Sequence, residues 1–78
     1  MPDENNSFGV ILFHTNSSAL RAEKLLIKSG LTVKLIPTPS ELSSDCGVSL
    51  RFPWSDEARV RALIDLASID IDTINPMQ

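Results

Sequence analysis

Phe8-Gly9-Val10-Ile11-Leu12-Phe13-His14-Thr15-Asn16-Ser17-Ser18 is the stretch of sequence that decides the fold. Residues 8–14 form a nearly continuous apolar run, which is typical of a strand at the centre of a sheet or covered on both faces. Residues 15–18 then offer hydroxyl and amide side chains in succession, the kinds that cap the N-termini of helices. The stretch therefore predicts a central strand that leads directly into a helix.

Hydrophobic periodicity predicts that this helix spans residues 17–29 and that Gly30 terminates it. Its broad apolar face is expected to hold Ala19, Leu20, Ala22, Leu25, Leu26 and Ile27, and its opposite, charged face Arg21, Lys24 and Lys28.

The rest of the chain continues the alternation of strands and helices. Residues 31–35 and 47–52 each alternate between apolar and polar side chains, which predicts two strands with one wet face. Pro37 and Pro39 are expected to stop the earlier strand and to stiffen the connection. A second helix is predicted to start at Ser55-Asp56-Glu57, and a last strand at residues 69–72, with Asn75-Pro76 ending the domain; the apolar stripe of the second helix is Val60, Leu63, Ile64 and Ala67.

The order strand, helix, strand, strand, helix, strand predicts an α+β fold of the ferredoxin-like type, βαββαβ, with a four-stranded antiparallel sheet and two helices on one face. Residues 8–75 are expected to form a single domain, with a disordered N-terminal tail at 1–7 and a C-terminal tail at 76–78. The sheet face away from the helices is expected to be open and of mixed charge, carrying Thr32, Lys34, Ser49, Arg51, Asp70 and Asp72.

Composition narrows the function classes. The formal charge of −3 disfavours non-specific nucleic-acid binding, and without tyrosine the open sheet face lacks the stacking aromatics of an RNA-recognition domain. The longest apolar run is too short for a membrane span. One cysteine and one histidine are too few for a metal site made by protein alone, so we expect no metal and no bound cofactor. An unpaired cysteine fits the cytoplasm, and we expect a monomer or a weak homodimer.

Cys46 is the only cysteine, which leaves three readings: a reactive or carrier thiol, an intermolecular disulfide partner, or a small buried core residue. In the predicted topology the start of the third strand meets the end of the first. Cys46 should then face His14 and the helix-capping residues Thr15, Ser17 and Ser18. It is also in phase with Val48, Leu50 and Phe52, which points its sulfur to the helix-covered side.

The surroundings of Cys46 favour moderate activation of the thiol. A helix N-terminus lowers the pKa of a nearby thiol, whereas the adjacent Asp45 raises it. Gly47 leaves the sulfur accessible. His14 is either a base for the thiol or a strand-end histidine with a satisfied hydrogen bond. Glu23 either bonds the backbone of the proline loop, pairs with a cation such as Arg51, or reaches solvent.

Three segments resemble a family of small bacterial domains, the selenium/sulfur carrier-like family: Ala19-Leu20-Arg21-Ala22-Glu23-Lys24-Leu25-Leu26, then Val33-Lys34-Leu35-Ile36-Pro37-Thr38-Pro39, then Leu42-Ser43-Ser44-Asp45-Cys46-Gly47. The match spans roughly residues 8 to 74. The resemblance implies a carrier thiol at Cys46 that holds sulfur or selenium as a persulfide or perselenide. The Pro37–Ser44 loop, with Ser43, Ser44, Pro37 and Pro39, would support it.

The resemblance also implies partners, namely a donor such as a cysteine desulfurase and an acceptor protein. On this reading the chain is a carrier or accessory protein more than a stand-alone enzyme, since neither a phosphate loop nor a catalytic triad is present. The alternative is a non-catalytic module that binds a protein or a small ligand, because this fold hosts many such domains.

Overall fold

A computed structural model describes residues 7–38 and 47–77 of the chain. The elements alternate as strand, helix, strand, strand, helix and strand, with a short 3₁₀ turn, η1, before the second helix. In chain order they are β1 (Phe8–Leu12), α2 (Asn16–Lys28), β2 (Lys34–Pro37), β3 (Val48–Pro53), η1 (Trp54–Asp56), α3 (Glu57–Leu66) and β4 (Thr73–Met77).

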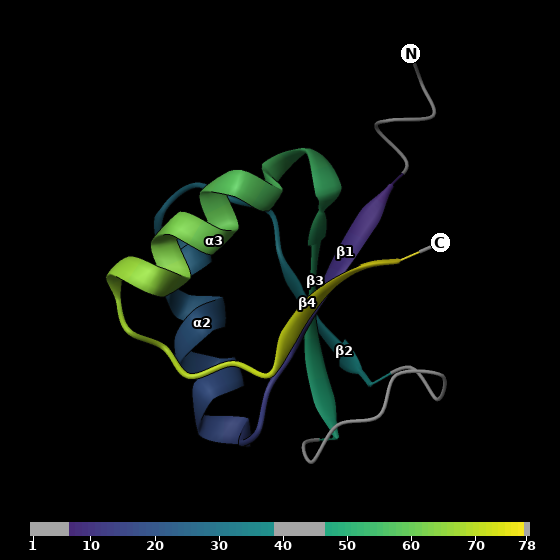
Figure 1. Cartoon of the computed structure of the whole chain (residues 1–78), viewed down its shortest axis with the longest axis vertical. Coiled ribbons are helices and arrows are strands. Elements are labelled where there is room, and N and C mark those ends of the chain that lie inside the picture. Colours follow the sequence, from purple (N-terminus) through teal and green to yellow (C-terminus); the bar gives the residue numbers. More distant parts are fainter. Residues whose placement is uncertain (1–6, 39–46, 78) are drawn as a thin grey trace.

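The four strands form one sheet in the order β2-β3-β1-β4, and every neighbouring pair is antiparallel. Both helices lie on the same side of this sheet (Figure 1). The order and the single helical layer confirm the predicted ferredoxin-like fold. The apolar strand at the start of the chain is central, as predicted, since β1 pairs with β3 on one side and with β4 on the other.

The core lies between the sheet and the helices. Alternate strand residues point into it, and each helix contributes the apolar stripe that periodicity predicts. The cluster includes Ile11, Leu50 and Phe52 from the sheet, Ala19, Ala22 and Leu26 from α2, and Val60 and Ile64 from α3. The wider apolar face expected of the first helix is wrong at two positions. Leu20 and Ile27 are 49% and 53% exposed, because the buried stripe of α2 is narrower than the run of apolar letters suggests.

Gly9 makes room for an aromatic pair beside the core. It lies opposite Phe52 in the β1–β3 register. The rings of Phe52 and Trp54 stack with their centroids 5.9 Å apart. A β-carbon built on Gly9 would lie 2.5 Å from Phe52 Cζ and 2.5 Å from Trp54 Cε3. Trp54 thus packs against the core at the start of the second helical segment.

Both helices end with the same backbone motif, and because of this motif the strand after each helix starts later than predicted. Gly30 has a φ of 90°, and the amide of Leu31 donates to the carbonyl of Leu26 at 3.0 Å. Ser68 has a φ of 56°, and the amide of Ile69 donates to the carbonyl of Ile64 at 3.1 Å. These are Schellman ends, in which the residue after the left-handed one packs back on the helix. The strand predicted at residues 31–35 therefore begins later, at Lys34, and the strand predicted at residues 69–72 is wrong in its place, since β4 begins only at Thr73.

Pro37 is the last residue of β2, as predicted, whereas Pro76 does not end the chain's last strand, because β4 continues to Met77. Both strands, β2 and β4, are edges of the sheet. The amide of Thr38 donates to the carbonyl of Gly47, so the alternation of an antiparallel ladder turns the nitrogen of Pro37 away from β3. In the same way Trp54 N–H donates to the carbonyl of Ser7, so the odd-numbered residues of β1 form their hydrogen bonds with β3 and the even-numbered ones with β4. Pro76 lies opposite the odd-numbered Gly9, so its nitrogen is turned away from β1.

The sheet face away from the helices differs from the expected open surface. Val10 lies opposite Arg51 and Leu12 opposite Ser49 on that face, and Val10, Leu12 and Ser49 are buried. The guanidinium of Arg51 stacks over the ring of Phe8, 4.5 Å from its centroid. Three further residues expected there precede a strand instead of lying in one: Thr32, Asp70 and Asp72. The mixed-charge open face is therefore wrong in most of its positions.

Candidate functional site

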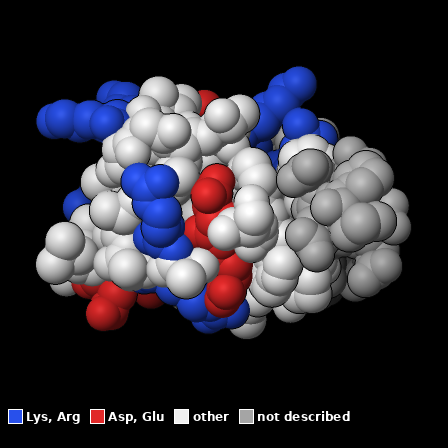
Figure 2. Space-filling model, turned by 90° about the horizontal axis from the view of Figure 1, so that it is seen from above, with Lys and Arg blue, Asp and Glu red and all other residues white. Residues whose placement is uncertain are grey.

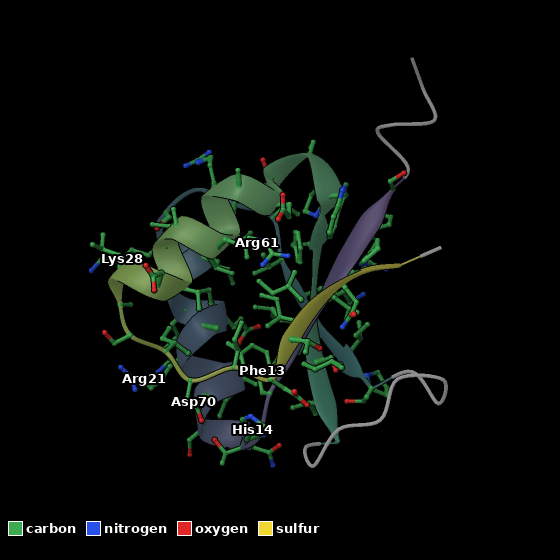
Figure 3. The ribbon with its side chains drawn as sticks, in the orientation of Figure 1. Phe13, His14, Arg21, Lys28, Arg61 and Asp70 are labelled. Atoms are coloured by element: carbon green, nitrogen blue, oxygen red, sulfur yellow. The ribbon has the colours of Figure 1, made fainter. Side chains whose placement is uncertain are left out.

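The predicted meeting of chain segments at one end of the sheet is confirmed for the described residues. Leu12 lies opposite Ser49, so the end of β1 and the start of β3 lie at the same end of the sheet. His14 follows β1 there and is exposed beside the first turn of α2 (Figure 3). Gly47, the residue before β3, is joined to the end of β2 because its carbonyl accepts from Thr38 N–H at 3.0 Å.

The N-terminus of α2 at this end is capped by Thr15. Its backbone is extended, with φ −139° and ψ 155°, and its Oγ1 accepts from Ser18 N–H at 3.2 Å. The same hydroxyl donates to Ser18 Oγ at 3.2 Å. Ser17 is exposed inside the first turn and is not the cap. No acidic residue lies in the first turn of α2, so the partial positive charge of the helix end is not neutralised from within the helix.

A polar pair at the root of the β2–β3 connection is a feature that sequence reasoning missed. Thr38 Oγ1 and Ser49 Oγ share a hydrogen bond of 2.8 Å, and Ser49 is fully buried. The sequence placed Ser49 on an open face, where a hydroxyl needs no partner. The signal was the cross-strand register: Ile36 lies opposite Ser49, and Thr38, two residues further on, lies on the same face as Ser49 and within its reach.

Gly47 is exposed, and a β-carbon added to it would meet no atom within 4 Å. Space alone therefore does not require glycine there. Five of the predicted site residues lie outside the described residues: Pro39, Ser43, Ser44, Asp45 and Cys46.

Comparison with known families identifies the chain. Residues 8–76 match the family described as "Putative Se/S carrier protein-like". The chain belongs to this family. No match was found among curated proteins or among solved structures. The matched range runs from Phe8, the first residue of β1, to Pro76, one residue before the end of β4. The family match therefore covers nearly all of the ferredoxin-like unit of this carrier-like domain.

Glu23 is half-buried on α2 of the carrier-like domain, at the edge of the apolar stripe, as expected. Its suggested ion pair with Arg51 is wrong. Arg51 lies on the opposite side of the sheet, where it stacks on Phe8. Glu23 therefore does not link the helix to β3 through that cation.

Acidic and basic side chains are interspersed on the face of the carrier-like domain that Figure 2 shows, so charge is not concentrated there. Within residues 7–38 and 47–77, no group of three or more His, Cys, Asp or Glu side chains is placed to hold a metal ion. In that same part of the chain, neither helix is both long and apolar enough to cross a bilayer.

Proposed function

We propose that this protein carries sulfur or selenium on the thiol of Cys46, as a persulfide or a perselenide. The observation that carries the proposal is the family match over residues 8–76 in a chain whose only cysteine is Cys46. A carrier-like domain needs an atom that can hold the chalcogen reversibly, and a thiolate is the side chain suited to that chemistry.

The proposed transfer is thiol exchange with a donor persulfide. The Cys46 thiolate attacks the outer sulfur of the donor, the sulfur–sulfur bond of the donor breaks, and the donor cysteine leaves as a thiolate. Cys46 then holds one additional sulfur atom as a persulfide. Release to an acceptor thiolate repeats the exchange, so the cycle needs neither an oxidant nor a reductant.

Two features of the described residues support this chemistry. The N-terminus of α2 lies at the same end of the sheet as Gly47, and its first turn contains no acid. Helix N-termini stabilise thiolates and so lower the pKa of a thiol that reaches them. Gly47 is the covalent neighbour of Cys46, and its carbonyl is tied to Thr38 at the end of β2.

The partners that we propose are a donor such as a cysteine desulfurase and an acceptor protein, and the domain works as a monomer or a weak homodimer. A free carrier thiol requires a reducing compartment, so we propose the cytoplasm as its location.

The test is intact-mass analysis of the native protein after incubation with a cysteine desulfurase and cysteine. The proposal expects one added sulfur atom that a thiol reductant removes, and no added sulfur on Cys46→Ser. A His14→Ala variant tests the suggested base: it should load more slowly at neutral pH. A protein whose thiol alkylates only after denaturation, and that gains no sulfur when native, would show that Cys46 is a core residue.

A further inference from the structure

A cavity of about 360 Å³ lies between α3, the segment that follows it and the edge strand β4. Its apolar lining is aliphatic and comes from all three parts: Ile64 from α3, Ile69 and Ile71 from the segment, and Ile74 from β4. Ile64 and Ile69 belong to the buried core, so the floor of the cavity is held by core packing.

The rim of the cavity carries charges of both signs. Arg61 and Asp65 lie one turn apart on α3 and both line the cavity. Arg61 lies on the side of α3 that faces the sheet (Figure 3). Its Nε–H donates to Glu57, and the remaining N–H groups of a guanidinium stay available for a second carboxylate.

The third polar group on the rim, Ser68, occupies a backbone position that favours glycine. Its φ is 56°, and it takes the same place at the end of α3 that Gly30 takes at the end of α2. A residue with a β-carbon is disfavoured in this left-handed conformation. The chain therefore retains a hydroxyl side chain at a cost in backbone energy, and that side chain lines the cavity.

We infer that this cavity binds a free aliphatic α-amino acid. The ligand's carboxylate pairs with Arg61 and its ammonium group with Asp65, while Ser68 hydrogen-bonds one of them and the aliphatic side chain lies on the isoleucines. The volume lies near the lower end of the range for ligand sites, which suits a molecule of this size. The inference does not depend on Cys46, so it stands or falls separately from the carrier function.

The experiment is an amide chemical-shift titration of the full chain with L-leucine and three related probes. These are 3-methylbutylamine, which lacks the carboxylate, 4-methylpentanoate, which lacks the ammonium group, and L-serine, which lacks the aliphatic side chain. Saturable shifts centred on Ile64, Ile69, Ile71 and Ile74 are expected with leucine, with weaker binding of every other probe.

Variants assign the contacts. Arg61→Met should weaken leucine binding by about tenfold or more, since a charge-assisted contact is lost, and leave 3-methylbutylamine binding unchanged. The matched control is Arg59→Met on the same helix, whose guanidinium donates to the carbonyl of Ser29 at 3.3 Å and does not line the cavity. Asp65→Asn should weaken leucine and 3-methylbutylamine alike.

Ser68→Gly separates binding from folding. It should raise the Tm of the free protein by a few degrees, because the backbone strain is relieved, and at the same time weaken leucine binding. The inference is overturned if millimolar leucine gives no saturable shifts at these residues. It is also overturned if Arg61→Met and Arg59→Met bind leucine equally well.

Discussion

Gly9→Ala tests whether the close packing of Phe52 and Trp54 is the reason for glycine at position 9. The added β-carbon would lie 2.5 Å from both Phe52 Cζ and Trp54 Cε3, and 2.9 Å from Phe52 Cε1. Carbon atoms pack at about 3.5–4.0 Å, so the rings must move by roughly 1 Å. Phe52 is fully buried and has little room to move, whereas Trp54 is half-buried.

The magnitude follows from three terms. Overpacking of a core costs about 1–3 kcal/mol. Disturbing the ring stack costs up to about 0.5–1.5 kcal/mol more. Alanine restricts the unfolded chain more than glycine does and returns about 0.4–1 kcal/mol. The net loss in the free energy of unfolding is therefore about 0.5–4 kcal/mol, a large part of the total for a domain of this size.

Urea unfolding monitored by Trp54 fluorescence and by circular dichroism measures this loss. The midpoint should fall with an unchanged m-value, and the Tm should fall by at least about 2 °C. Gly47→Ala is the matched control, since a β-carbon there meets nothing within 4 Å, and it should leave stability unchanged or slightly raised. If Gly9→Ala is as stable as the control, the rings can yield and close packing is not the reason for the glycine.

Two further predictions concern the end of the sheet where the carrier site is proposed. Thr15→Ala removes the cap of α2 and should lower the free energy of unfolding by about 0.5–2 kcal/mol in urea melts, whereas Ser17→Ala, in the same exposed turn, should change it by less than about 0.5 kcal/mol; equal effects would show that Thr15 is not the cap. A double-mutant cycle with Thr38→Val and Ser49→Ala should give a coupling of about 0.5–1.5 kcal/mol for the shared hydrogen bond, and additive effects would show that the two hydroxyls do not stabilise each other.

The sequence predicted the order of the elements and failed at two strand starts for one physical reason. Leu31 and Ile69 are apolar and stand at the head of alternating stretches, so each reads as the first residue of a strand. In the structure each closes the helix before it, with its amide bonded to a helix carbonyl and its side chain nearly buried. Periodicity does not distinguish these two uses of an apolar residue, because both place the side chain in the same core.

Proline produced one further error, at the end of the last strand. Pro37 ends β2 as predicted, whereas Pro76 lies inside β4, an edge strand, with its nitrogen turned outward, where a missing N–H breaks no ladder bond. Which way the proline nitrogen faces depends on the hydrogen-bond register of the ladder, which the predicted topology alone does not give. The candidate site was predictable to the extent that it follows from topology, which brings His14, Thr15 and Gly47 to one end of the sheet. The Thr38–Ser49 pair required the register.

Pro37 and Pro76 also determine how copies of this protein behave toward one another. A small domain opens often, and an exposed sheet margin on a folded copy is the usual template on which opened chains assemble into fibrils. Here the two outermost strands each lack one donor where an incoming strand would need it. At these two positions, a folded copy therefore offers an opened one a poorer template for strand addition.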